Sequence, residues 1–95
     1  MNTLEARYGV DTPLTVWVRK DDAKVDFTDE TITVAAFAYG STMPVDTLEA
    51  ASPEVGKVTF TVSKEATERT LSPALYRLSV RASDQEYWAG LLRIV

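Results

Sequence analysis

The stretch "LSPALYRLSV", residues 71–80, joins a polar run to a segment in which apolar and polar residues alternate. In that segment Tyr76, Leu78 and Val80 share one side, while polar side chains occupy the other. A period of two residues is typical of a β-strand that buries one face. The stretch therefore predicts a strand that begins near Tyr76.

The junction before this strand predicts a corner between two sheets. A chain that crosses from one sheet of a sandwich to the other passes over an exposed end of the core. The side chain of Leu71 is expected to fill and cover that end. Pro73 restricts the backbone φ at the turn. Tyr76 is then expected to place its ring in the core and to bond its hydroxyl to an upstream backbone group, which is a tyrosine corner. The alternative is that Leu71 and Tyr76 are core residues around an ordinary loop.

Similar patterns recur along the chain. Alternating or wholly apolar segments predict further strands at residues 13–19, 31–39, 45–50, 57–63 and 86–95. Only residues 64–71 fit a short helix, with Ser63 as its cap, and residues 83–85 fit a hairpin turn. We predict one all-β domain over residues 1–95, an immunoglobulin-like two-sheet β-sandwich of about six to eight strands. Residues 1–8 are expected to form an N-terminal arm without a core role of its own.

The residue types that are missing exclude several kinds of chemistry. The chain has no Cys and no His, so disulfides, thiolate zinc sites and Ser-His-Asp catalysis are excluded. The net charge is -4 and the cations are scattered, whereas nucleic-acid binding needs a basic stripe. The longest apolar stretch, residues 34–39, is too short to span a bilayer. We therefore expect no enzyme activity, no cofactor, and no nucleic-acid or membrane partner.

An acidic segment at residues 21–30 is the one candidate for a metal site. Calcium takes six to eight oxygen ligands, which carboxylates can supply. The spacing matches no EF-hand loop, because the required Gly and the closing Glu are missing. A solvated loop is the prediction and a calcium site is the alternative, for the residues Asp21, Asp22, Asp26, Asp29 and Glu30. We assign no catalytic, cofactor-binding or metal-binding residue.

Five large apolar side chains are out of phase with the expected core face of their strands. We predict that they form one exposed surface on the sheet that contains the first and last strands: Trp17, Phe37, Tyr39, Tyr87 and Leu91. Exposed apolar patches often mark a protein partner, and aromatic residues are enriched at interfaces. The alternative is that the phase of one strand is wrong, or that the N-terminal arm covers this face.

Four segments carry a resemblance to a known group of domains: "GVDTPLTVWV", "VDFTDETITV", "VGKVTFTVSKEATERTLSPALYRLSV" and "YWAGLLRIV". Together they resemble the immunoglobulin-like domains of tailed-phage virion proteins, in particular the N-terminal domain of phage baseplate upper proteins and related neck and fibre domains. The chain departs from that pattern at Asp29, where the turn usually has Gly, and at Ala74, near the place where the corner usually has Gly. The spacing to the corner Tyr also differs slightly.

The resemblance implies a structural component of a phage virion, made in the cytoplasm of the bacterial host. It would be a capsid decoration, a neck or collar subunit, or a tail or baseplate adaptor. Its partners would be other virion proteins, and a homo-oligomer is one expected form. An alternative interpretation, from another class of function, is a monomeric β-sandwich module that binds carbohydrate or a host surface protein. Trp17 and Trp88 are its candidate sugar platforms, although Trp88 is expected to face inward.

Overall fold

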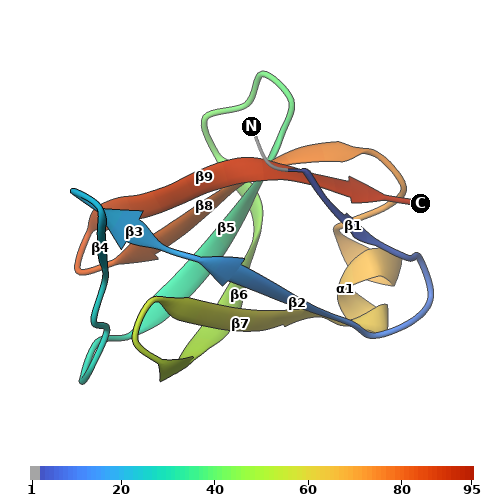
Figure 1. Ribbon diagram of the computed structural model, residues 1–95. Coiled ribbons are helices and arrows are strands. Elements are labelled where there is room, and N and C mark those ends of the chain that lie inside the picture. Colours follow the sequence, from blue (N-terminus) through green and yellow to red (C-terminus); the bar gives the residue numbers. More distant parts are fainter. Residues whose placement is uncertain (1–2) are drawn as a thin grey trace.

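The computed structural model describes residues 3–95, and its regular structure is almost entirely β-strand (Figure 1). One short helix, α1 (Lys64–Arg69), lies between β7 and β8 in this part of the chain. The strands are β1 (Thr3–Ala6), β2 (Thr12–Trp17), β3 (Arg19–Lys20), β4 (Ala23–Lys24), β5 (Ile32–Ala38), β6 (Pro44–Glu54), β7 (Lys57–Val62), β8 (Leu75–Ala82) and β9 (Gln85–Ile94).

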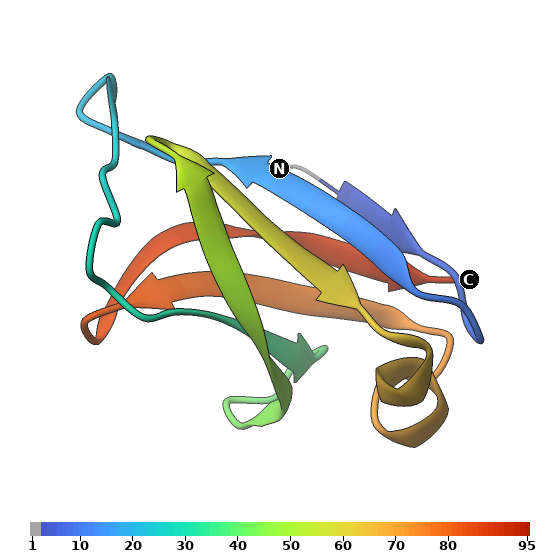
Figure 2. The ribbon, with the colours of Figure 1, turned by 90° about the horizontal axis from the view of Figure 1, so that it is seen from below.

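Seven of these strands form one hydrogen-bonded sheet in the order β1-β9-β8-β5-β6-β7-β2, and β3 pairs with β4 in a separate hairpin. The large sheet folds over at β6. The first part of β6, from Pro44 to Ala50, pairs with β5, and its last part, from Ala50 to Glu54, pairs with β7. The folded sheet has two layers (Figure 2), which we call the β9 layer (β1, β9, β8 and β5) and the β7 layer (β6, β7 and β2).

This arrangement is an immunoglobulin-like β-sandwich, because β5, β8 and β9 lie in one layer of the folded sheet and β2 and β7 lie in the layer opposite. The predicted fold class is therefore confirmed. Seven strands form the sandwich, within the predicted range of about six to eight, and β3 and β4 add a small hairpin beside it.

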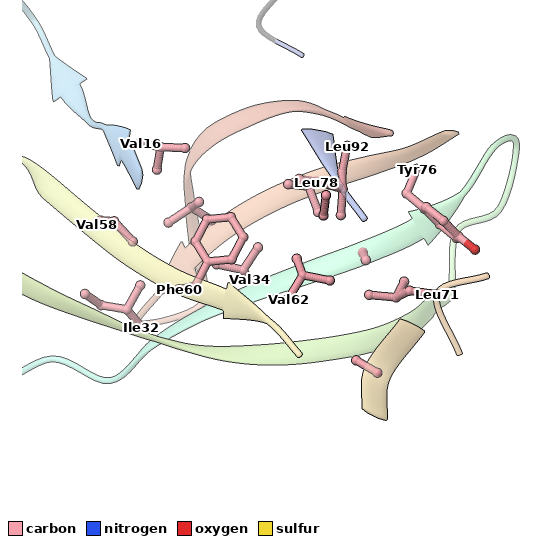
Figure 3. Close-up of a cluster of buried hydrophobic side chains, with 14 of the residues drawn as sticks. Val16, Ile32, Val34, Val58, Phe60, Val62, Leu71, Tyr76, Leu78 and Leu92 are labelled. Carbon is pink, nitrogen blue, oxygen red and sulfur yellow. The ribbon is translucent and has the colours of Figure 1, made fainter. Parts of the chain in front are cut away.

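The core lies between the two layers and consists of the inward side chains of the alternating strands (Figure 3). Burial of apolar surface stabilises the fold by roughly 25 cal/mol per Å², so these side chains dominate the favourable terms. The core includes every inward residue predicted from the alternation of β7 and β8: Val58, Phe60, Val62, Tyr76, Leu78, Val80 and Ala82.

The segment between α1 and β8 has the geometry of a tyrosine corner. Leu71 is fully buried at the end of the core, and the ring of Tyr76 is 5% exposed. The Tyr76 hydroxyl donates a hydrogen bond of 2.8 Å to the carbonyl oxygen of Ser72. Pro73 lies on the exposed turn between them. The corner thus ties the start of β8 to the loop that brings the chain across from the β7 layer.

Two short connections follow the sequence prediction. Helix α1 is a single short helix, and the hydroxyl of Ser63 accepts a 3.1 Å hydrogen bond from the N–H of Ala66, which caps it. The hairpin between β8 and β9 turns at Ser83 and Asp84, whose φ angles are 50° and 60°. Positive φ at both central residues is the mark of a type I′ turn, which suits the twist of the strands.

The N-terminal segment has a core role, so the prediction of an arm over residues 1–8 is wrong for its described part. β1 pairs in parallel with β9, and Ala6 is fully buried. The N–H of Tyr8 donates a 2.8 Å hydrogen bond to the carbonyl oxygen of Val95. Residues 1–2 lie outside the described part of the chain. The strand escaped prediction because it is short and its partner is distant in sequence.

The strand predicted at residues 45–50 is longer than expected. It falls in the first part of β6, which begins at Pro44 and runs on through Pro53 to Glu54. The register of β6 against β7 shifts between Ala51 and Glu54. An irregularity of this kind bends a strand, which lets β6 pass from one layer to the other. Pro53 can be accommodated there because irregular pairing does not require its missing N–H.

Candidate interaction surface

The outward side chains of the β9 layer form rows that cross its strands. Phe37 on β5 is opposite Arg77 on β8, and Arg77 is opposite Leu91 on β9. In an antiparallel sheet, residues opposite each other point to the same face. We call Leu91, Arg77 and Phe37 the large row.

Tyr39 joins the large row on the outer face. The guanidinium carbon of Arg77 lies 4.2 Å from the centroid of the Phe37 ring, a cation–π contact. Tyr39, Gly40, Arg77 and Leu91 line a hollow of about 290 Å³. Tyr39 is 82% exposed, whereas Phe37 and Leu91 are half-buried. We call Phe37, Tyr39, Arg77 and Leu91 the aromatic cluster.

Three of the five residues predicted to form one surface therefore lie together. The sequence prediction missed Arg77, which lies between Phe37 and Leu91. Its outward position in the alternation of β8 was visible in the sequence, but its neighbours on β5 and β9 depend on the register.

Tyr87 does not belong to this surface, and that part of the prediction is wrong. The residues on either side of it, Glu86 and Trp88, are both opposite residues on β8, so the pairing skips Tyr87. Such a bulge turns the extra side chain away from its regular direction. The Tyr87 ring packs edge-on against Phe27, with 5.2 Å between the ring centroids and 82° between the planes, and contacts the core.

Trp17 lies on the other layer, so the predicted single surface is wrong for this residue as well. β2 is at the far end of the sheet order from β1 and β9. The indole is 54% exposed, and the ammonium groups of Lys24 and Lys57 each lie 5.8 Å from its centroid. Lys57 also forms an ion pair of 3.8 Å with Glu54. Trp17 is thus an exposed aromatic side chain of the β7 layer, with two cations over its ring.

Trp88 is half-buried and packs against the core, which is the inward orientation that the alternation predicts. Together with Leu4, Val16 and Trp17 it lines a small opening of about 180 Å³ between the edges of β1 and β2. Trp88 therefore contributes to the core more than to an exposed platform.

The acidic segment at residues 21–30 contains more structure than a solvated loop. Asp21 and Asp22 form the turn of the β3–β4 hairpin, with φ angles of 54° and 64°. Phe27, in the middle of the segment, is 4% exposed and belongs to the core. Among residues 3–95, no group of three or more acidic side chains is placed to hold a metal ion.

Asp26 is the acidic residue with a distinct electrostatic environment. Its carboxylate accepts hydrogen bonds from the hydroxyl and the backbone N–H of Thr28. Because these bonds favour the ionised form, with the hydroxyl bond the stronger cause, they lower the pKa of Asp26 from its ordinary value. The Asp26 side chain is exposed, and its hydrogen bonds to Thr28, two residues further on, organise a local turn.

The one helix in the described residues, α1, has six residues and is too short to cross a membrane.

Comparison with known proteins identifies no family. No family model matches the chain, and no curated protein matches it. Among solved structures, the crystal structure of the ZIG-8–RIG-5 IG1–IG1 heterodimer is similar to this chain, with a TM-score of 0.48 and 7% sequence identity. The similarity covers 98% of this chain and 81% of that one.

Proposed function

We propose that this chain is a structural component of a phage virion that acts through protein–protein contacts. Its place would be that of a capsid decoration, a neck or collar subunit, or a tail or baseplate adaptor. The observation that carries the proposal is the aromatic cluster on the outer face of the β9 layer, where Tyr39 is 82% exposed beside Arg77. Aromatic residues and Arg are the types enriched at interfaces and at their energetic centres.

Two features of the sequence support this proposal. The segments quoted above resemble immunoglobulin-like domains of tailed-phage virion proteins, so the partners would be other virion proteins and the location the virion, after synthesis in the host cytoplasm. The chain also has no His and no Cys for acid–base or nucleophilic catalysis. A small sandwich of this kind acts through its surface.

The test is whether the chain is incorporated into particles. Phage particles are purified from bacteria that carry the gene for the chain, and the particles are analysed by quantitative mass spectrometry. We expect the chain to be present at a fixed ratio to the main capsid protein. The double variant Tyr39→Ser/Leu91→Ser should fold and lose incorporation, because it removes two members of the aromatic cluster. Trp17→Ser is the matched control, since it removes an exposed aromatic from the other layer.

Absence of the wild-type chain from purified particles would contradict the proposal. Unchanged incorporation of the double variant would show that the aromatic cluster is not the contact surface.

A monomeric carbohydrate-binding module is the second candidate, and Trp17 favours it. The exposed indole offers apolar surface to a sugar ring, while the ammonium groups of Lys24 and Lys57, which lie over the indole, would pair with an acidic substituent of the sugar. Titration with uronic-acid oligosaccharides, followed by tryptophan fluorescence, would then saturate for wild type and give no change for Trp17→Ala. A flat titration of the wild-type protein removes this candidate.

A further inference from the structure

We propose that the free edge of β2 binds an extended segment of a partner protein, which adds to the β7 layer as an antiparallel strand. This edge belongs to the other layer from the aromatic cluster, so the inference goes beyond the proposed function and does not depend on it. The backbone of β2, the strand order of the sandwich, an apolar opening and a pair of cations carry the inference.

The backbone groups of β2 that point away from β7 have no partner in the described part of the chain. Val18, directly after β2, is opposite Gly56 and donates its N–H to the Gly56 carbonyl oxygen at 2.7 Å. Backbone groups of successive strand residues point to opposite sides, so those of Thr15 and Trp17 point away from β7. β2 ends the sheet order, with β7 as its one hydrogen-bonded neighbour. Thr15 and Trp17 therefore offer N–H and carbonyl groups to an added strand.

Pro13 fits this assignment of the free edge. It lies two residues before Thr15 on β2, so its nitrogen also points away from β7, where the N–H that Pro lacks is not needed. Pro residues and charges often protect edge strands from pairing. Pro13 blocks its own position alone, which leaves the edge open from Thr15 onward.

An immunoglobulin-like sandwich has a place for a strand beside this edge. In the constant-type arrangement, one sheet has the strand order A-B-E-D and the other has C-F-G. Here β2, β7 and β6 take the places of B, E and D, and β5, β8 and β9 take those of C, F and G. The first described strand, β1, pairs in parallel with β9 and does not take the place of A beside β2. A strand added to β2 would therefore complete the sheet.

The added strand would also cover an apolar opening. The opening of about 180 Å³ between the edges of β1 and β2 is lined by Leu4 and Trp88 from the β9 layer and by Val16 from β2. Val16 points into the core, and a residue opposite it on an added strand would point to the same side. An apolar side chain at that position would be buried against all three residues. The occupant is thus an extended segment whose inward residues are apolar.

The charges at one end of the edge favour an acidic residue in the occupant. Arg19 lies two residues after Trp17 and is opposite Lys24 in the β3–β4 hairpin, although like charges in opposite positions repel. In the described part of the chain neither cation forms an ion pair, not even with Asp21 or Asp22 in the turn between them. A carboxylate opposite Arg19 would therefore lie near two cations that the chain itself leaves uncompensated.

A synthetic peptide tests the proposal by NMR on the full, isotope-labelled chain. The capped peptide has about six residues, the length of a typical strand, and alternates valine with threonine. A glutamate replaces the first threonine, which places it opposite Arg19 in antiparallel pairing. The amide signals of Thr15 and Trp17 should shift, and their hydrogen exchange should slow by roughly tenfold or more. The amide of Val16, which points to β7, should exchange as before.

A fused form of the segment makes the test independent of the affinity of a short peptide. The segment is attached ahead of residue 1 through a Gly/Ser linker of about 15 residues, which spans roughly 20 Å. Tethering of this kind gives an effective concentration in the millimolar range. The fused chain should melt at a higher temperature than a chain that carries the linker alone.

Thr15→Pro removes an N–H from the free edge and leaves the ladder with β7 intact. Pro13 already occupies a position of the same kind, so the variant should fold, which thermal melting checks, and it should lose the added strand. Thr15→Val keeps the N–H and should bind the segment like wild type. Lysine in place of the glutamate of the peptide should weaken binding about fivefold, because it adds a third cation beside Arg19 and Lys24.

Three outcomes would overturn the inference. The first is unchanged hydrogen exchange at Thr15 and Trp17 in the fused chain, and the second is equal protection of Trp17 in the fused Thr15→Pro variant. The third is protection of both amides in the wild-type chain alone as its concentration rises, which would make a second copy the occupant. Each of these results leaves the proposed function standing, because incorporation through the aromatic cluster is measured on the other layer.

Discussion

The Tyr76 hydroxyl and the Ser72 carbonyl oxygen are joined by a hydrogen bond of 2.8 Å across the corner that leads into β8. The donor belongs to a ring that is 5% exposed, and the acceptor belongs to the loop that follows α1. The bond holds the loop against the end of the core, where Leu71 is buried. One side chain thus satisfies a backbone carbonyl and fixes the entry of a central strand.

Tyr76→Phe should lower the free energy of unfolding by about 1–3 kcal/mol, because the ring stays buried while the Ser72 carbonyl loses its donor. Urea denaturation measures this change. Tyr39→Phe is the matched control, since that side chain is 82% exposed. This variant should have the same urea midpoint as wild type. Equal midpoints for Tyr76→Phe and wild type would show that the bond contributes no stability.

Gly56→Ala should destabilise the fold more than Gly40→Ala does. Both glycines have positive φ, +83° and +81°, so each substitution incurs strain of about 1–2 kcal/mol. At Gly56 the new methyl group would also lie 2.9 Å from Cβ of Lys24, whereas at Gly40 nothing lies within 4 Å. Crowding of this kind costs a further ~1–3 kcal/mol. Thermal melting of the two variants measures the difference in stability. Equal losses of stability would contradict the close packing of Lys24 on Gly56.

Thr28→Val should raise the pKa of Asp26 toward its ordinary value, because it removes the hydroxyl that donates to the carboxylate and keeps the backbone N–H. A lowered pKa in the folded state stabilises the fold above the unfolded pKa, and this contribution disappears as the pH falls through the folded pKa. The variant should therefore lose less stability on acidification than wild type. NMR titration of the carboxyl carbon measures the shift, with Thr61→Val as a control that should leave the Asp26 titration unchanged.

Calcium and EDTA should give the same melting temperature. Asp21 and Asp22 are held in a hairpin turn, and the Asp26 carboxylate is engaged by Thr28. A ligand at 100 times its dissociation constant would stabilise the folded state by about 2.7 kcal/mol. For a domain of this size, that stabilisation is a rise in melting temperature of roughly 10–20 °C. Differential scanning calorimetry in each buffer measures the difference, and a rise of that size in calcium would establish a metal site in this segment.

Alternation of apolar and polar residues was sufficient to predict much of this fold from the sequence. It predicted strands at β7 and β8 and identified their buried faces, because the side a residue points to depends only on its place within a regular strand. The tyrosine corner was also predictable, since Leu71, Pro73 and Tyr76 act within a few residues of one another. These features need no knowledge of which strands are neighbours.

The composition of the candidate surface was decided by tertiary structure alone. Phe37 and Leu91 meet at Arg77 because of the register of three strands, and no local pattern encodes that register. The bulge that turns Tyr87 inward shifts the pairing by one residue, and Trp17 is remote because β2 ends the sheet on the other layer. Pairing between distant segments sets all three outcomes. The sequence by itself therefore determined which side chains leave each strand outward, while the long-range pairing of strands determined which of them share a face.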